Sequence, residues 1–211
     1  MQISGGTVNA QNIAAGPGAR ASSGEARSQP VLMEKERNVF VIHGRDEEFR
    51  KRIFDLLRRM DLNPLEWETV VHDLGHSSPY LGEVLDQAFT MMQAALVLMT
   101  PDDMVRLHPD LVPDEDERVV ECQARPNVLF EAGMAFAKCP ERTVLLQAGR
   151  MRPVSDFGGR NYVAFDGSVR SINKLKLRLR TAGCAVRETG SDYLDTEQLH
   201  DLGAYTRRPR G

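Results

Sequence analysis

The sequence predicts an α/β fold of the flavodoxin-like type, with about five parallel strands in one sheet and helices on both faces. Two short apolar runs, at residues 39–42 and 94–99, have the composition of strands that are buried on both faces. Amphipathic helical patterns lie between them. Parallel strands need crossover connections, so strands that alternate with helices over roughly 150 residues predict a parallel sheet.

The first half of this domain is expected to contain two strands and two helices. Residues 62–67 predict a weaker second strand, because Pro64 removes a backbone donor, and a loop is expected over 70–78. Ser78 and Pro79 suit the N-cap and the first position of a second helix. The first helix, over 46–60, is predicted by apolar residues at helical spacing, which are Phe49, Ile53, Leu56, Leu57 and Met60.

The second half is expected to contain three strands and two helices. The strand at 94–99 is followed by the polar residues 102–124, which we interpret as an exposed loop. A short helix is expected over 126–138. Two further strands are expected at 143–147 and 162–165, and a basic helix after them carries Ile172, Leu175 and Leu179 and is closed by Gly183.

The composition is that of a soluble intracellular protein. The 27 basic and 30 acidic residues give a formal net charge of −3, so direct binding to nucleic acid or to an anionic membrane is not expected. The three cysteines are widely spaced and form no CxxC pair, which argues against both a disulfide framework and a structural zinc. The N-terminus lacks the pattern of a signal peptide, and no run approaches the ~20 apolar residues of a membrane span. We therefore expect a cytoplasmic protein.

The two ends of the chain differ in composition from the middle. Residues 1–36 are rich in small and polar residues and are expected to form an arm, although the alternation over 5–13 leaves open a short strand against a neighbouring chain. Residues 188–211 are polar and are interpreted as a tail. The folded domain is accordingly expected to span residues 37–187.

The carboxyl ends of the first and third strands predict the position of a ligand site. In the flavodoxin-like strand order these ends lie at the point where the order reverses, and ligands bind beyond them. Two polar turns follow these strands, residues 43–46 and 100–103. Gly44 allows a close backbone approach, and Arg45 with the helix-start amides after it can receive a phosphate. A dinucleotide fits this arrangement, although such residues also serve turns and caps.

Three histidines are further candidates for a functional role. His43 is either a neutral imidazole bonded to backbone at a strand end or a catalytic group. His72 and His76 are four positions apart, but the Gly75 between them argues against a helix that presents both to a metal, and we assign them no function.

Glu131 is the one charged residue in the apolar segment 128–137. A carboxylate among apolar residues costs free energy unless it has partners, and its desolvation raises its pKa and strengthens its field on a nearby cation. This favours a functional role. Alternatively, Glu131 shares a helical spacing with Asn127, Met134 and Lys138, and it then lies on a solvated stripe.

Three sequence blocks together resemble a known family. VFVIHGRDEEFRKRIFDLL at 39–57, LVLMTPDD at 96–103 and RPNVLFEAGMAFAK at 125–138 resemble bacterial TIR-like domains, described as nucleotide-binding and found in antiphage effectors. The likeness covers residues 37–187. It implies a flavodoxin-like TIR fold and, as in catalytic members, hydrolysis of the nicotinamide–ribose bond of NAD, which is a substrate and not a cofactor.

The resemblance also implies roles for individual residues. Glu131 matches the catalytic glutamate of the family, and Asn127, one turn earlier, would orient it. Residues 68–80 would act as a lid or contact a second TIR unit. No sensor domain accompanies the TIR domain in this sequence, so activation by self-association, as a homo-oligomer or filament, or by a separate sensor protein is expected. The substrate pocket would be lined by His43, Gly44, Arg45, Asp46, Thr100 and Asp102.

Other functions remain as alternatives. A non-catalytic TIR interaction module would use the same surfaces for protein contacts, and a nucleoside-processing transferase would act on free nucleosides. A phosphoryl-accepting receiver domain would need an Asp at the end of the third strand and a Lys at the end of the fifth, where this chain has Thr100 and Asp166. The basic residues Lys174, Lys176, Arg178 and Arg180 are the one feature in favour of nucleic-acid binding, and such a run is usually a solvated helix face.

Overall fold

A computed structural model describes residues 35–75, 79–112, 120–154 and 162–209. The chain divides into two units, residues 1–31 and 32–211, and all described residues belong to the second. The arm expected over 1–36 lies outside the described residues except for its last two, which begin the short 3-10 helix η1 (Lys35–Arg37). The strand considered over 5–13 lies entirely outside them.

The core of the second unit is a parallel sheet of five strands, in the order β2-β1-β3-β6-β7. This is the flavodoxin-like order predicted from the sequence, and it places the carboxyl ends of β1 and β3 side by side at the point where the order reverses. The register aligns Val39 with Ala94 and Ile42 with Val97. The strands are β1 (Asn38–Ile42), β2 (Asn63–Leu65), β3 (Ala94–Met99), β6 (Thr143–Ala148) and β7 (Val163–Phe165).

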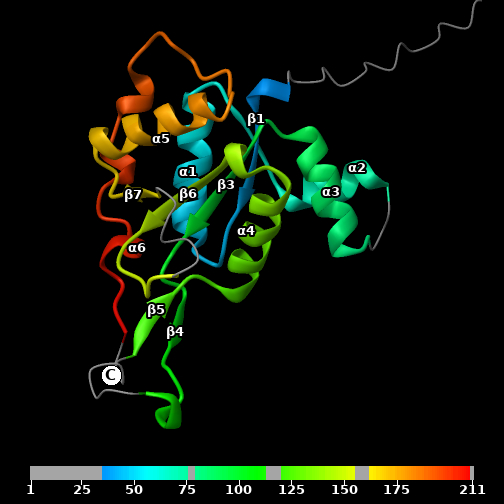
Figure 1. Cartoon of the computed structure of the whole chain (residues 1–211). Helices are drawn as coiled ribbons and strands as arrows, with labels where there is room; N and C mark the ends of the chain where they lie inside the picture. The colour runs from blue at the N-terminus through cyan, green and yellow to red at the C-terminus, as the bar shows by residue number, and fades with distance from the viewer. Residues whose placement is uncertain (1–34, 76–78, 113–119, 155–161, 210–211) are drawn as a thin grey trace, which may run out of the picture. The chain divides into compact units, whose positions relative to one another are not determined.

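Helices cover both faces of the sheet (Figure 1). On one face α1 (Glu47–Arg59) and α5 (Val169–Thr181) pack on a core that includes Leu96 and Leu98 of β3. On the other face α2 (Trp67–Leu74), α3 (Leu81–Met91) and α4 (Pro126–Lys138) pack on a core that includes Val97 and Met99. Successive side chains of β3 thus alternate between two buried faces, which explains its continuous apolar sequence.

The loop predicted over 70–78 is wrong for most of its length, because α2 extends from Trp67 to Leu74. The signal for this helix is present in the sequence: Trp67, Val70, Val71 and Leu74 have the i, i+3, i+4, i+7 spacing of an amphipathic helix and pack against the same core. Gly75, at φ 68°, ends the helix in the left-handed conformation.

The start predicted for the following helix is also wrong. The N-cap of α3 is Tyr80 and not Ser78, and Ser78 lies outside the described residues. The Glu83 carboxylate accepts a hydrogen bond from the Tyr80 amide at 3.2 Å, which satisfies one free donor of the first turn. The acceptor for the Tyr80 amide is therefore a side chain of α3 itself.

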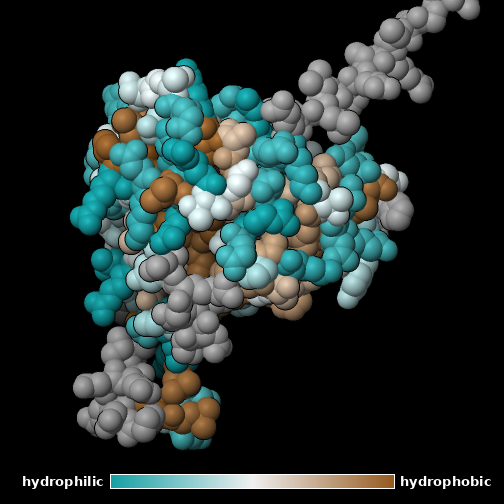
Figure 2. All heavy atoms as spheres, turned by 45° about the horizontal axis from the view of Figure 1, so that its top comes forward, coloured by the Kyte–Doolittle hydropathy of each residue, from teal (hydrophilic) through white to brown (hydrophobic). Residues whose placement is uncertain are grey.

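The exposed loop predicted over 102–124 contains a small antiparallel sheet. Strands β4 (Asp103–Val105) and β5 (Glu121–Gln123) pair with Met104 opposite Cys122, and the 3-10 helix η2 (Pro109–Leu111) follows β4. These residues extend away from the five-stranded sheet and are called the β4–β5 arm (Figure 1). Figure 2 shows hydrophobic atoms at its far end, where Leu111 is 67% exposed.

The segment after α5 is polar in composition, but several of its apolar residues are buried. It contains η6 (Asp192–Leu194), η7 (Glu197–Leu199) and α6 (Gly203–Thr206). Leu199, Leu202 and Ala204 are buried in the core that α1 and α5 cover. The C-terminal segment, residues 188–209, is thus part of the folded body.

One further element completes the description. The 3-10 helix η4 (Pro140–Arg142) connects α4 to β6. Within the described ranges, every helix is too short or too polar to cross a lipid bilayer.

Gly149→Ala is expected to destabilise the fold more than an equivalent change elsewhere. Gly149 has φ 71°, and a Cβ there would clash with the carbonyl oxygen of Ala204 in the C-terminal segment. Gly75→Ala is the matched control, because Gly75 has φ 68° and no atom within 4 Å of the added Cβ. Both changes carry the cost of the left-handed conformation, about 1–2 kcal/mol. We expect Gly149→Ala to lower the free energy of urea unfolding by about 2 kcal/mol more than the control; equal losses would contradict the packing described for the C-terminal segment.

Candidate functional site

The turn after β1 is held by two buried carboxylates. Asp46 is the N-cap of α1, and its Oδ1 accepts a hydrogen bond from the Phe49 amide at 2.9 Å. Asp102, from the turn after β3, accepts a hydrogen bond from the Arg45 amide at 2.8 Å through its Oδ2. The two side chains are only 7% and 5% exposed. Each carboxylate is therefore already held by a hydrogen bond to a backbone amide of the protein.

Gly44 is required by the approach of Asp102. A Cβ at position 44 would overlap the Asp102 carboxylate, so only glycine allows Asp102 to reach the Arg45 amide. The Arg45 amide, which directly precedes the amides that were expected to receive a phosphate, is thus bonded to a carboxylate of the protein. The Arg45 side chain has no hydrogen bond or ion pair to another described residue.

Arg207, from the C-terminal segment, joins the two turns. Its Nη2 lies 2.8 Å from Asp46 Oδ2, and its Nη1 lies 3.8 Å from Asp102 Oδ1. Nη1 also donates a hydrogen bond to the Pro101 carbonyl at 3.5 Å. One guanidinium therefore compensates two nearly buried carboxylates.

The start of α4 lies against the same turn. Arg125 directly precedes α4, and its Cγ would lie 3.6 Å from a Cβ at Gly44. Its Nη1 lies 3.4 Å from Asp103 Oδ1 in an ion pair. Six residues of helix rise correspond to about 9 Å, so Glu131 is a short distance along α4 from the turn after β1.

Glu131 lies on the flank of α4 that faces α3. Val128 and Ala135, three residues before and four after it, are fully or nearly buried. Lys138, seven residues later and on the same flank, forms an ion pair with Asp86 of α3 at 2.8 Å. Glu131 itself is half-buried and has no hydrogen bond or ion pair to any described residue, and burial raises the pKa of its carboxyl group from 4.5 to about 7. It does not belong to a fully solvated helix face.

The structure brings together only part of the set of residues expected at the site. Gly44, Arg45, Asp46 and Asp102 form one connected group. Thr100 is next to it, with its carbonyl accepting from the Asp102 amide at 2.8 Å, but it is only 3% exposed. The position of each residue is a finding, whereas its role in binding stays a prediction.

Asn127 lies outside this connected group, and His43 contacts the group through the Gly44 carbonyl oxygen. The His43 ring packs edge-on against Phe54 of α1 at 6.4 Å, and its Nδ1 lies 3.0 Å from the Gly44 carbonyl oxygen. It is therefore directed to the sheet face opposite α4, in agreement with its bonding to backbone. Asn127 is exposed in the first turn of α4.

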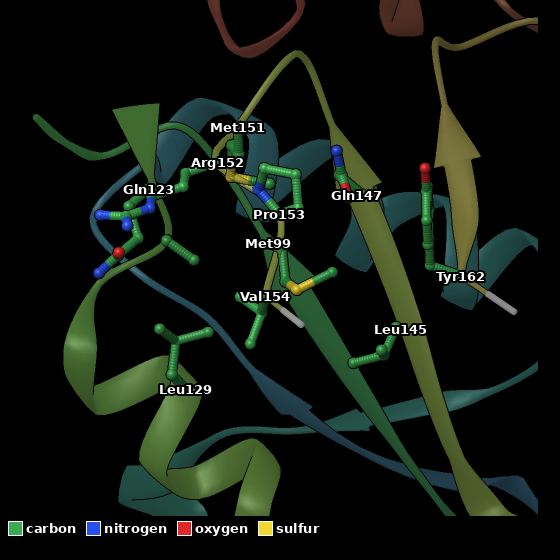
Figure 3. A pocket seen from close by; sticks show the side chains of 11 residues that line it. Met99, Gln123, Leu129, Leu145, Gln147, Met151, Arg152, Pro153, Val154 and Tyr162 are labelled. Atoms are coloured by element: carbon green, nitrogen blue, oxygen red, sulfur yellow. The ribbon is translucent and has the colours of Figure 1, made fainter. Parts of the chain in front are cut away.

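A separate apolar pocket lies on the other flank of α4 (Figure 3). Its cavity volume is about 150 Å³, and Met99, Leu129 and Leu145 come together in it from β3, α4 and β6. Leu129 and Glu131 are two positions apart and thus point about 200° apart around the helix. None of the residues predicted for the site lines this pocket. The pocket is therefore distinct from the region between the turns after β1 and β3, residues 44–46 and 101–103, which is called the β1–β3 crevice below.

Two residues of the crevice were missed by sequence reasoning. Arg125 begins the sequence block 125–138 but was given no role there, and its proximity to Gly44 follows only from the packing of α4. Arg207 is 161 residues after Asp46 in a segment interpreted as a tail, and no spacing in the sequence links the two. Among the described residues there is no cluster of three or more His, Cys, Asp or Glu side chains that could hold a metal ion.

The strand order and the polar turns beyond β1 and β3 define a flavodoxin-like α/β fold of the TIR type, with the half-buried Glu131 on α4. Comparison with protein families confirms this class. Residues 38–167, more than half of the chain, match the family described as "CAP12/Pycsar effector protein, TIR domain". The chain belongs to this family of bacterial antiphage TIR domains. A search among curated proteins found no match.

The raised pKa of Glu131 predicts a pH-dependent stability. The folded chain holds a proton at Glu131 up to about pH 7, whereas the unfolded chain loses it near its ordinary pKa of 4.5. The folded state therefore loses stability as pH rises between these values. We expect the free energy of unfolding of the wild type, relative to Glu131→Gln, to fall by about 1 kcal/mol from about pH 5 to about pH 8, after allowing for solvent screening of a half-buried group.

Chemical denaturation across this pH range measures the effect. Glu48→Gln, at an exposed position in α1, controls for the loss of one charge. A constant difference between wild type and Glu131→Gln would show that the Glu131 carboxyl group is not desolvated.

Proposed function

We propose that this protein is an NAD glycohydrolase of antiphage defence that cleaves the nicotinamide–ribose bond with Glu131. The observation that carries the proposal is the state of this carboxylate: it is half-buried, without a described partner, and on α4, whose start lies against the turn after β1. Membership of the CAP12/Pycsar effector TIR family supports a defence effector. NAD cleavage goes beyond this family membership and is part of the proposal.

A single carboxylate suffices for this reaction. Nicotinamide in NAD is a pyridinium and leaves as a neutral molecule with the electron pair of the C–N bond, so no acid needs to protonate it. Bond breaking generates an oxocarbenium-like ribosyl group. An ionised Glu131, poorly solvated and unpaired, stabilises this cation more strongly than a carboxylate in water would.

Water completes the reaction. It attacks C1′ of the ribose, forms the new C–O bond and loses one proton, giving ADP-ribose. Glu131 is suited to accept this proton, because its pKa of about 7 is close to neutral pH. The ionised form is needed at the start of the reaction, so activity is expected to increase as pH rises through about 7.

The β1–β3 crevice is proposed to hold the rest of the dinucleotide. The exposed Arg45 guanidinium is suited to the diphosphate, since it is free of described partners. Asp46 and Asp102 are nearly buried and bonded to the protein, so we assign them to shaping the crevice. Direct contacts of His43, Thr100 and Asn127 with the substrate remain part of the proposal and have less support from their positions.

Activation is proposed to depend on assembly. In this proposal, self-association of the TIR domain or binding of a separately encoded sensor completes the site. Activity at a fixed total amount of NAD is then expected to rise more steeply than in proportion to protein concentration. Strict proportionality down to dilute monomer would contradict this part.

Nicotinamide release from NAD, followed by chromatography at high protein concentration, tests the proposed reaction. Wild type is expected to release nicotinamide, and Glu131→Gln is expected to lose at least about 100-fold in rate, because the amide cannot stabilise a cation in the same way. Glu48→Gln should retain the wild-type rate.

Two outcomes would count against the enzyme. Equal rates for wild type and Glu131→Gln would remove the role of this carboxylate. The absence of release at every concentration and in every assembled form would favour a non-catalytic interaction module instead.

A further inference from the structure

The C-terminal segment delivers a charged side chain to the β1–β3 crevice from outside the matched family region. The family match ends at residue 167, whereas Arg207 contacts the turns after both β1 and β3. Nothing in the sequence predicted this contact. The C-terminal segment thus contacts the turns of the site in addition to packing on the core.

The position of Arg207 is well determined by its neighbours in the chain. Tyr205, two residues earlier, donates a hydrogen bond to the Leu199 carbonyl at 2.9 Å, and its ring packs edge-on against Phe49 at 6.2 Å. Phe49 is in the first turn of α1, and its amide is bonded to Asp46. The segment is thus anchored on the same helix start that its arginine contacts.

The contact differs from an ordinary surface ion pair. Exposed pairs contribute little because both charges are well solvated. Here the Arg207 side chain is 40% exposed, but the Asp46 and Asp102 side chains are only 7% and 5% exposed, and loss of the guanidinium between them would leave two poorly solvated like charges. The arrangement of both carboxylates therefore depends on Arg207.

We propose that Arg207 is a positioning residue of the nucleotide crevice. It holds Asp102 against the Arg45 amide and Asp46 at the start of α1, and so fixes the two turns between which the dinucleotide binds. This inference rests on the proposed function for its ligand. Arg207 acts through the turns and takes no part in bond breaking.

Amide hydrogen exchange of the free protein tests the positioning without any substrate. In Arg207→Gln the Arg45 amide, whose acceptor is Asp102, is expected to exchange at least about tenfold faster. Arg208→Gln is the matched control, because Arg208 is exposed and its only hydrogen bond to a described residue is to the Arg207 carbonyl. Arg207→Lys keeps the charge but loses the forked geometry, so an intermediate rate is expected, and it serves as the second variant should Arg207→Gln fail to fold.

Steady-state kinetics with NAD tests the link to the site. Arg207→Gln is expected to raise KM about tenfold and to leave kcat within about twofold, because substrate binding and not the chemical step depends on the turns. Arg208→Gln should match the wild type. A fall in kcat with KM unchanged, or unaltered exchange at Arg45, would overturn the proposal.

The two measurements separate this proposal from the proposed function. If the wild type neither binds nor cleaves NAD, the proposed function fails and the nucleotide part of this inference fails with it. Exchange at the Arg45 amide then still decides whether Arg207 holds the turn. If NAD is cleaved and Arg207→Gln has wild-type KM and exchange, only the present inference fails.

Discussion

The hydrogen bond from the Arg45 amide to the Asp102 carboxylate, formed across Gly44, is the contact on which the arrangement of the site depends. It joins the turns that follow β1 and β3, at the place where the strand order reverses. It requires a residue without a side chain at position 44 and a carboxylate that is almost entirely removed from water. Such a carboxylate is stable only with compensation, and Arg207 supplies it from the far end of the described chain.

The same contact changes the interpretation of the helix start. The first amides of a helix are suited to bind an anion, and the sequence suggested a phosphate of a dinucleotide. In the structure, carboxylates of the protein occupy these acceptor positions. Asp102 accepts a hydrogen bond from the Arg45 amide, and Asp46 accepts one from the Phe49 amide. The turns after β1 and β3 therefore carry two nearly buried carboxylates beside the exposed Arg45 side chain, and the Arg45 and Phe49 amides already have carboxylate partners.

The central layers of the fold could be predicted from the sequence because buried parallel strands must be apolar throughout, as at residues 39–42 and 94–99. The helix α2 was not predicted because Gly75 and the polar residues after it are typical of a loop, although the helical spacing from Trp67 to Leu74 was present. The β4–β5 arm and the packing of the C-terminal segment could not be predicted, since short strands such as 103–105 and isolated contacts such as Arg207 with Asp46 have no periodic signal. Glu131 was identified from its apolar surroundings, and its half-buried state agrees with that reasoning, but its catalytic role stays a prediction.

Two places on the molecule are candidates for the nucleotide site: the β1–β3 crevice at the start of α4, and the apolar pocket that Leu129 of α4 lines. Amide chemical-shift perturbation in the Glu131→Gln variant, titrated with NAD so that no turnover occurs, distinguishes them most directly. The proposed site predicts the largest shifts at Gly44, Arg45 and residue 131. Shifts confined to Leu129, Leu145 and Tyr162, or no shifts in any assembled form, would contradict the claim that the dinucleotide binds where the ends of β1 and β3 meet.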